Sequence, residues 1–229
     1  MQPAGPLLAA GRDCDIFEHG PGTVLRRSRA GRSLGAEARV MEYAREQGYP
    51  VPAVVELADG DTVMVLERVE GPSMVEWLGR RPWTVRAQGR LLADLHARLH
   101  CIEGPGWLPA APCGQGDRLV HLDLHPLNVL VGRRGPVVID WTGAARGDPA
   151  VDVALAWALM TGGAIPGGRA KAAVLGTGRA LLVRSFLSGC DVPSARRALR
   201  AVVDWKVRDP HMSAEERAGM QRLVETDAA

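Results

Sequence analysis

The stretch Val120-His-Leu-Asp-Leu-His-Pro-Leu-Asn-Val-Leu-Val131, followed by Val137-Val-Ile-Asp-Trp141, decides the fold of this 229-residue chain. Its polar residues follow the spacing H-x-D-x-x-x-x-N, and the second string contains a second acidic residue, Asp140. Phosphoryl transfer needs these groups: one carboxylate orients or deprotonates an attacking hydroxyl, while an amide and a second carboxylate hold magnesium against the phosphates. The spacing therefore predicts Asp123 as the catalytic residue and Asn128 and Asp140 as ligands of Mg²⁺.

Two other interpretations of the same residues stay open at this point. Asp123 and Asp140 could be ordinary turn carboxylates with no chemical role. His121, Asp123 and His125 could instead form the ligand set of a metal hydrolase, because alternate residues on an extended strand share one face. The second interpretation lacks a further histidine-rich motif, which a zinc site would be expected to show.

Three ordered strings resemble the aminoglycoside phosphotransferase and choline kinase family. Residues 121–128 match the family pattern H-G-D-x-x-x-x-N, and residues 138–141 match V-I-D-W or V-I-D-F. The third string, Gly147-Asp-Pro-Ala-Val-Asp-Val-Ala154, matches the pattern G-D-P-x-x-D-L-A. Members of this family are small-molecule kinases with a protein-kinase-like fold. The resemblance implies ATP as the phosphoryl donor, with GTP left open, and magnesium as the cofactor.

The fold class implied is α+β, a bilobal protein-kinase-like fold with a small antiparallel-sheet N-lobe and a mainly helical C-lobe. We expect the nucleotide-binding lobe at residues 1–71 and the catalytic and acceptor-binding lobe at residues 72–229. Hydrophobic patterning in the first part predicts strands, a helix and more strands, an order typical of a kinase small lobe. The expected elements are strands at 16–19 and 23–27, a helix at 34–47, and strands at 51–57 and 62–69.

The second part is expected to be helical outside the catalytic stretch. Asp148 is predicted to cap a helix that has Pro149 at its first position. Residues 128–131 and 136–139 are predicted to pair as a hairpin, and residues 102–118, rich in Gly and Pro, to form a surface loop. Other expected features are Thr84 as an N-cap, a buried stripe of Leu91, Leu92, Leu95 and Leu99, and a capping box in Ser213-Ala-Glu-Glu216.

The family places a basic residue on the third strand, where it grips the phosphates and is held by a helix glutamate. Arg26 is the matching residue here and replaces the family's usual lysine; no lysine precedes Lys171. Arginine keeps the charge but is longer and forked, so it is not an equivalent replacement. Glu37 is the matching acid, with Glu42 as an alternative on the same helix, and Arg26 could instead be one of several surface arginines.

The resemblance also implies the position of the adenine. The carbonyl of Glu67 and the amide of Val69 are expected to bind the base, and residues 11–15 to cover the nucleotide or to form a plain turn. Leu122 and Leu127 stand where the family's loop more often has glycine. Because leucine does not easily adopt a positive φ, the sequence leaves the exact loop conformation open at these positions.

Four further polar residues are expected to support the catalytic loop. His121 and His125 should brace it, Asp148 should cap the following helix, and Asp152 should anchor the loop from within that helix. Trp141 is expected to be a packing residue.

Composition limits the choice of partners. The net charge of +2 does not indicate the excess of basic residues that is typical of nucleic-acid-binding proteins. The four cysteines form no C-x-x-C pair, which favours reduced thiols, and no apolar run approaches the ~20 residues of a membrane span. We therefore expect a cytoplasmic protein that contacts neither nucleic acid nor membrane.

The expected function is transfer of the γ-phosphoryl group of a nucleoside triphosphate to a hydroxyl of a small molecule, such as an antibiotic or a metabolite. An alternative from another class is a nucleotide-binding pseudokinase or regulatory protein, suggested by the missing lysine. A protein-substrate kinase ranks third, because no A-P-E-like segment follows Asp140. Residues 151–229 carry 8 acidic and 11 basic side chains, so they show no acidic pocket suited to a polycationic acceptor.

Overall fold

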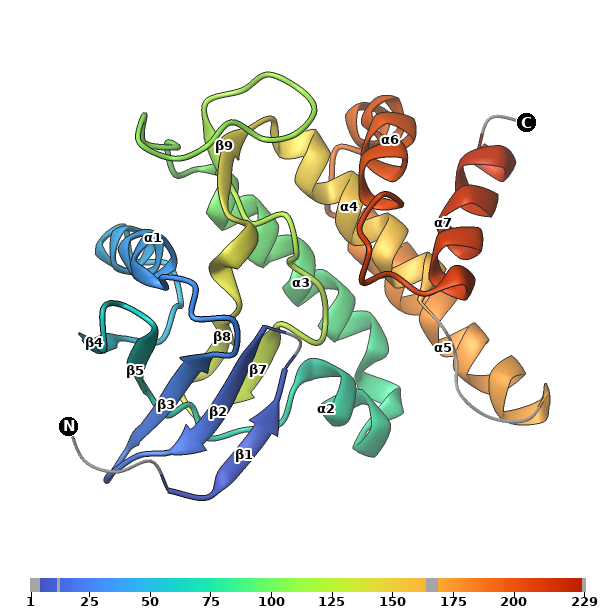
Figure 1. Cartoon of the computed structure of the whole chain (residues 1–229). Coiled ribbons are helices and arrows are strands. Elements are labelled where there is room, and N and C mark those ends of the chain that lie inside the picture. The colour runs from blue at the N-terminus through green and yellow to red at the C-terminus, as the bar shows by residue number, and fades with distance from the viewer. Residues whose placement is uncertain (1–4, 12, 164–168, 228–229) are drawn as a thin grey trace. The chain divides into compact units, whose positions relative to one another are not determined.

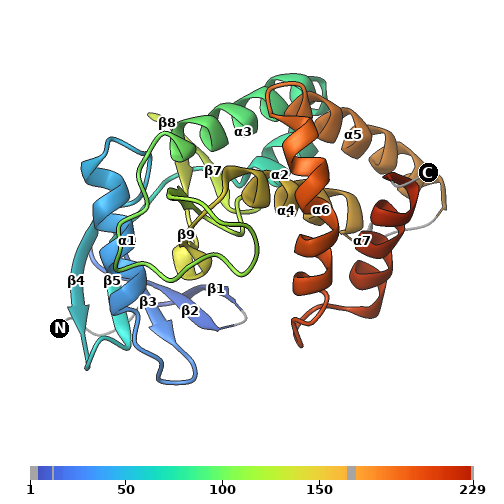
Figure 2. The same ribbon diagram turned by 90° about the horizontal axis from the view of Figure 1, so that it is seen from above.

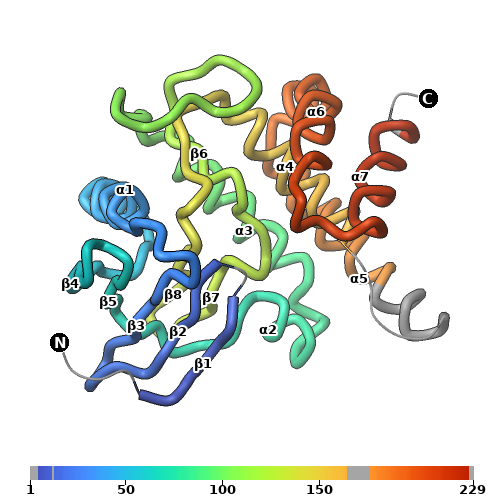
Figure 3. The backbone as a smooth tube through the Cα atoms, viewed as in Figure 1, coloured from blue at the N-terminus to red at the C-terminus, as the bar shows by residue number. Residues whose placement is uncertain are grey.

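The computed structural model describes residues 5–11, 13–163 and 169–227. The chain divides into two compact units. The first comprises residues 1–72 and 129–142, and the second comprises residues 73–128 and 143–229. Figure 1 shows the helices and strands of both units, and β6 is labelled in Figure 3.

The first unit is built on a five-stranded antiparallel sheet in the order β1-β2-β3-β5-β4. Figure 2 shows helix α1 alongside β4 and β5. A two-stranded hairpin of β7 and β8 completes the unit. The bounds are β1 Leu7–Ala10, β2 Cys14–Glu18, β3 Thr23–Ser28, α1 Gly35–Glu46, β4 Val54–Ala58, β5 Val63–Glu67, β7 Val129–Gly132 and β8 Gly135–Val138.

The predicted strands and helix of this unit are present, and one strand was missed. The β1 segment is short and exposed throughout, so it carries no alternation of buried and exposed residues that a sequence pattern could reveal. The core is formed by the inner face of α1 and by strand residues, among them a continuous buried run in β5. Its fully buried members include Leu25, Met41, Ala44 and Met64.

The second unit is mainly helical, with one small sheet that pairs β6 with β9. Figure 3 traces the long connection between α3 and β6, the predicted surface loop. The bounds are α2 Met74–Arg80, a 3₁₀ turn Pro82–Thr84, α3 Val85–His100, β6 Arg118–Val120, β9 Ala145–Gly147, α4 Pro149–Gly162, α5 Arg169–Leu187, α6 Val192–Lys206 and α7 Ala214–Asp227. A second 3₁₀ turn, Trp141–Gly143, spans the boundary between the units.

Helix ends in this unit agree with the capping predictions except at α3. The Asp148 side chain accepts from the amide of Ala150, and Ser213 and Glu216 form the predicted capping box. Thr84 precedes α3, but its hydroxyl donates to the carbonyl of Arg81 instead of accepting from the helix. The preceding 3₁₀ turn captures this side chain, so Thr84 is not a side-chain cap.

In the core of the second unit, α3 packs on α5, and α4 packs on α6 and α7. Of the predicted stripe on α3, Leu92, Leu95 and Leu99 are buried, whereas Leu91 is partly exposed. Gly89 allows α5 to approach α3 closely, because a Cβ at this position would lie 2.6 Å from the Cβ of Ser185. This packing gives α3 and α4 the fixed positions from which their polar side chains reach the catalytic loop.

Candidate active site

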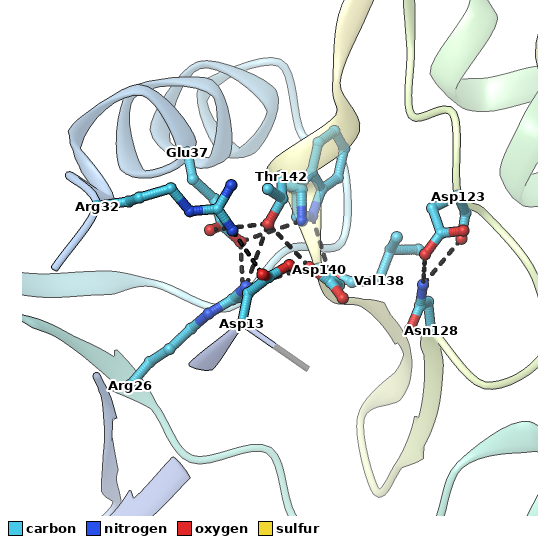
Figure 4. Close-up of polar contacts among 10 residues, drawn as sticks. Asp13, Arg26, Arg32, Glu37, Asp123, Asn128, Val138, Asp140 and Thr142 are labelled. Carbon is cyan, nitrogen blue, oxygen red and sulfur yellow. Dashed lines mark hydrogen bonds and ion pairs between the residues drawn. The ribbon is translucent and has the colours of Figure 1, made fainter. Parts of the chain in front are cut away.

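The sequence-predicted site residues fall into two groups, one in each unit. Figure 4 shows the contacts around Arg26 in the first group and the contact between Asp123 and Asn128 in the second. Arg26, Glu37, Glu67, Val69 and Asp140 lie in the first unit. The second unit contains the other predicted residues, which are Asp123, Asn128, His121, His125, Asp148 and Asp152.

Arg26 on β3 and Glu37 on α1 form a short, largely buried ion pair. Arg26 Nη1 lies 2.6 Å from Glu37 Oε1, and the two side chains are 12% and 4% exposed. Glu37 stands in the first turn of α1, where a carboxylate is favoured by the positive end of the helix dipole. The structure thus pairs Arg26 with Glu37 and leaves the alternative, Glu42, exposed.

Asp140 and Thr142 extend this pair into a network of four side chains. Arg26 Nη2 donates to Asp140 Oδ1 and to Thr142 Oγ1, both at 3.2 Å. The Thr142 hydroxyl lies 3.2 Å from Glu37 Oε2 and 3.0 Å from Asp140 Oδ1, and its single proton can serve only one of these carboxylates. Glu37 also accepts from the amide of Trp141 at 3.2 Å.

The network fixes the charge of Arg26 and leaves one side of Asp140 open. Burial lowers the pKa of Arg26, but the carboxylates of Glu37 and Asp140 outweigh it and raise that pKa. Burial raises the pKa of Glu37, against the lowering effect of Arg26. The Asp140 side chain is 44% exposed, and its contacts in the network all involve Oδ1. Its second oxygen is therefore available to a cation.

Backbone geometry presents Asp140 in an unusual way. Its φ is 65°, in the left-handed region that residues other than glycine seldom adopt. The buried Trp141 indole donates to the carbonyl of Val138 at 3.1 Å and packs edge-on against Tyr49. Trp141 is thus the packing residue predicted from the sequence, and it holds the turn that carries Asp140.

In the second unit, Asn128 and Asp123 are hydrogen-bonded to each other across residues 121–128, the predicted catalytic loop. The Asn128 Nδ2 group donates to the Asp123 backbone carbonyl at 2.9 Å and to Asp123 Oδ2 at 2.8 Å. Because both partners are acceptors, the amide nitrogen must face Asp123, and the amide oxygen points away. Asn128 therefore fixes the carboxylate and keeps an oxygen free for another ligand.

His125 supports the same carboxylate from the other side. Its Nε2 lies 3.4 Å from Asp123 Oδ1, and its Nδ1 accepts from the amide of Leu127. Burial raises the pKa of Asp123, but the hydrogen bond and charge of His125, together with His121 and Lys206, hold that pKa below its usual range. Asp123 is consequently an ionised carboxylate at neutral pH, with 32% of its side chain exposed.

Asp152 on α4 anchors the backbone of the catalytic loop. Its two carboxylate oxygens accept from the amides of His121 at 3.1 Å and Leu122 at 2.8 Å. These bonds accompany a φ of 58° at Leu122, so this leucine adopts the left-handed conformation that leucine does not easily take, which settles the point that the sequence left open. The two anchoring bonds and the burial of the Leu122 side chain offset the strain, of the order of 1–2 kcal/mol. Leu127 is exposed and does not adopt a positive φ.

The remaining predicted residues lie on loops and strand ends of the first unit. Glu67 ends β5, where its amide donates to the Ala53 carbonyl. Within the described chain, no hydrogen bond uses the amide of Val69, which leaves it available to a ligand. Residues 11–15 include the turn between β1 and β2, with Gly11 donating to Cys14; Arg12 lies outside the described residues.

The metal-hydrolase interpretation of His121, Asp123 and His125 is not supported. His121 is fully buried, and the one group of three possible metal ligands among the described residues is a different set on α3 and α4. All four cysteines are free thiols. Among the described helices, none combines the length and apolar character needed to cross a membrane.

Comparisons with known proteins give the family. A model of the phosphotransferase enzyme family matches residues 9–117 and 106–183. The chain belongs to the phosphotransferase enzyme family. A search of the curated proteins found no match.

Solved structures share the fold of this phosphotransferase at low sequence identity. A thermostable mutant of aminoglycoside phosphotransferase APH(4)-Ia is 16% identical, with a TM-score of 0.63 over 98% of this chain and 94% of that one. ADP-bound aminoglycoside phosphotransferase APH(2'')-Ib is 15% identical, with a TM-score of 0.64 over 96% and 91%. Amicoumacin kinase in complex with AMP-PNP, Ca²⁺ and Ami is 15% identical, with a TM-score of 0.52 over 99% and 88%. The predicted kinase-like α+β class is confirmed.

Sequence reasoning missed some residues that complete these groups. Thr142 bridges Glu37 and Asp140, and its only signal was its position two residues after the acidic one. His96 and His100 on α3 contact the loop and its anchor. Their spacing of four residues on one helix face was the available signal.

Proposed function

We propose that this phosphotransferase moves the γ-phosphoryl group of ATP to a hydroxyl group of a small molecule, with Mg²⁺ as cofactor. The observation that carries this proposal is the geometry of Asp123, an ionised, partly exposed carboxylate fixed by Asn128 and His125. Such a group can accept a hydrogen bond from an incoming alcohol and aim its oxygen at a phosphorus atom.

The low pKa of Asp123 suits an orienting role more than strong general-base catalysis. Phosphoryl transfer proceeds through a loose transition state in which the nucleophile needs little early deprotonation. A weakly basic carboxylate can therefore position the hydroxyl first and take its proton late. The hydrogen bond from Asn128 keeps the carboxylate from rotating away.

Asn128 and Asp140 have the oxygen donors that suit Mg²⁺, and we assign the metal to them from the sequence motif. The amide oxygen of Asn128 is turned away from Asp123, and one oxygen of Asp140 is not used in the Arg26 network. Hard oxygen ligands of this kind are what magnesium prefers. When bound, the ion would neutralise charge on the phosphates.

The first unit supplies the groups for the nucleotide. Arg26, kept charged by Glu37, is proposed to hold the phosphates, and the Glu67 carbonyl and the free Val69 amide to bind adenine. Solved relatives of the fold hold nucleotides: APH(2'')-Ib contains ADP, and APH(2'')-IIa forms a ternary complex with streptomycin and ATP. We accordingly propose residues 1–71 as the nucleotide-binding lobe and residues 72–229 as the catalytic and acceptor-binding lobe.

The acceptor is proposed to be an alcohol that need not carry several positive charges. Residues 151–229 have a net charge of +3, which would repel a polycation instead of attracting it. Structurally similar proteins form complexes with gentamicin or hygromycin B, and one is an amicoumacin kinase, so antibiotics with hydroxyl groups belong in the first panel. Neutral and anionic alcohols belong there equally.

The proposal is tested by ADP release in a coupled assay with a panel of hydroxyl compounds. Turnover that depends on one acceptor, needs Mg²⁺ and is lost in Asp123→Asn supports it. The rival function, a nucleotide-binding pseudokinase, is favoured by Arg26 standing where the family has lysine. MgATP binding without acceptor-dependent ADP release across the panel would favour that rival.

A further inference from the structure

A buried cluster of two histidines and one aspartate lies behind the catalytic loop in the second unit. His96 and His100 stand four residues apart on α3, so they share one helix face, and Asp152 faces them from α4. One ligand atom from each residue lies within 4.8 Å of the other two. His96 and Asp152 are almost fully buried, and His100 is 11% exposed.

The orientation of His96 leaves an acceptor facing another acceptor. Its Nε2 lies 3.1 Å from the carbonyl oxygen of Leu124, which can only accept, so Nε2 carries the hydrogen. Burial lowers the pKa of His96 to about 4, so the ring is neutral and Nδ1 bears a lone pair. Among the described residues this Nδ1 has no hydrogen-bond partner, and it lies 3.8 Å from Asp152 Oδ2.

Two lone pairs facing each other inside a protein are unfavourable unless a cation lies between them. Asp152 is ionised: burial raises its pKa, but the hydrogen bond to His100 lowers it well below its usual range, and its oxygens also accept from the amides of His121 and Leu122. The negative oxygen and the ring nitrogen therefore both face the same small space. A proton or a metal ion would relieve the repulsion.

The surroundings of the cluster match those of metal ligands. A ligating histidine commonly donates its other ring N–H to a backbone carbonyl, as His96 does to Leu124. A ligating carboxylate is commonly held by further hydrogen bonds, as Asp152 is by the amides of His121 and Leu122. These contacts fix the ligand atoms before any ion arrives.

We propose that His96 Nδ1, His100 Nε2 and Asp152 Oδ2 form a structural site for a transition-metal ion, with Zn²⁺ as the best-suited ion. With bonds of about 2.1 Å, ligand atoms around tetrahedral zinc lie about 3.4 Å apart. The observed separations from Asp152 Oδ2 are 3.8 Å to His96 and 3.1 Å to His100. Two imidazoles favour zinc over magnesium, so this site is chemically distinct from one for nucleotide-bound Mg²⁺.

The ion would take the place of the hydrogen shared by His100 and Asp152, and it would join α3, α4 and the catalytic loop through one centre. His100, the partly exposed ligand, gives the ion its way in. The inference does not rest on the proposed function, because metal binding is measured without any phosphoryl transfer.

The first experiment measures metal in the untagged full-length chain. Protein dialysed against a chelator is titrated with Zn²⁺ in competition with a chromophoric chelator, and separately with Co²⁺ followed by visible absorption. We expect one equivalent bound with a Kd below about 10⁻⁷ M, and a tetrahedral Co²⁺ spectrum. Zn²⁺ should also raise the melting temperature, as any ligand of the folded state does.

Matched variants locate the ion. His100→Asn should weaken Zn²⁺ binding at least about 100-fold, since even contacts behind the ligands are worth 10–100-fold. His211→Asn, on the exposed turn before α7, and His125→Asn, beside Asp123, should both retain the affinity. Loss of zinc in His125→Asn, or full retention in His100→Asn, would place the ion elsewhere. Absence of one-equivalent binding in the unmodified chain would assign the cluster to a proton and overturn the proposal.

Discussion

The substitution Arg26→Ala tests whether the arginine holds the phosphates. Its guanidinium is buried, charged and already anchored by Glu37 and Asp140, so it is pre-organised for a further anion. A hydrogen bond to a charged group contributes about 1.5–3 kcal/mol, which corresponds to a loss of about 10–150-fold in affinity for MgATP. Adenosine, which has no phosphate, should bind Arg26→Ala within about 2-fold of the unsubstituted chain.

The partner substitution Glu37→Gln should also lower the affinity for MgATP, because the amide keeps the shape of the carboxylate but loses the charge that orients Arg26. Arg26→Lys should be only partly tolerated, since lysine lacks the fork that reaches both Glu37 and Asp140. In the double variant Arg26→Ala with Glu37→Gln, the loss in MgATP affinity should fall short of the sum of the single losses by about 1 kcal/mol or more.

The measurement is isothermal titration calorimetry with MgATP and with adenosine, accompanied by thermal melts to confirm folding. Breaking a buried ion pair lowers the free energy of unfolding by about 3–5 kcal/mol. Because Glu37 keeps its hydrogen bonds to Trp141 and Thr142 in Arg26→Ala, we expect a loss of stability at the lower end of this range. The matched control is Arg27→Ala, an exposed neighbour on the same strand, which should change neither affinity. Strict additivity, or equal losses for ATP and adenosine, would refute the reasoning.

Three further predictions concern the other groups of the site. Asp123→Asn should preserve the fold and MgATP binding while lowering turnover about 10²–10⁴-fold, and unchanged turnover would remove Asp123 from the mechanism. Asp140→Ala should abolish the magnesium-dependent part of ATP affinity, so calorimetry with and without Mg²⁺ decides the assignment of this residue. In chelator-treated protein, the lowered pKa of His96, about 4, means that the unfolded chain binds this proton more readily. The free energy of unfolding should therefore fall by up to about 3 kcal/mol as pH drops from about 6.5 to 4. In urea denaturation, the free energy of unfolding of His96→Gln should change less with pH over this window than that of the unsubstituted chain. An equal pH dependence of the two would contradict the lowered pKa of His96.

Local signals in the sequence were sufficient where the structure depends on neighbours along the chain. The β7–β8 hairpin, the Asp148 cap and the Ser213 capping box all form as predicted, because each requires only residues a few positions apart. Ser73 and Glu76 carry the same capping signal at the start of α2, and a systematic search for it would have found that helix.

Features that depend on distant residues could not be predicted in this way. Leu122 adopts a left-handed conformation where local preference argues against it, and a carboxylate thirty residues later holds its backbone. The pairing of β6 with β9 and the role of Thr142 likewise depend on segments brought together by the fold. The family resemblance supplied Arg26 and Glu37 as partners, since spacing alone did not distinguish Glu37 from Glu42.

The network around Arg26 has a consequence for chemical labelling. Reagents that acylate an amine beside a bound nucleotide need a lysine there, and this chain has only Lys171 and Lys206. The guanidinium of Arg26, with its raised pKa, is not a nucleophile for such reagents. Amine-directed nucleotide probes would therefore lack a lysine target on β3 and would depend on Lys206, whose charge lowers the pKa of Asp123. Enrichment on immobilised ATP, which needs no covalent step, would be the suitable way to capture this protein.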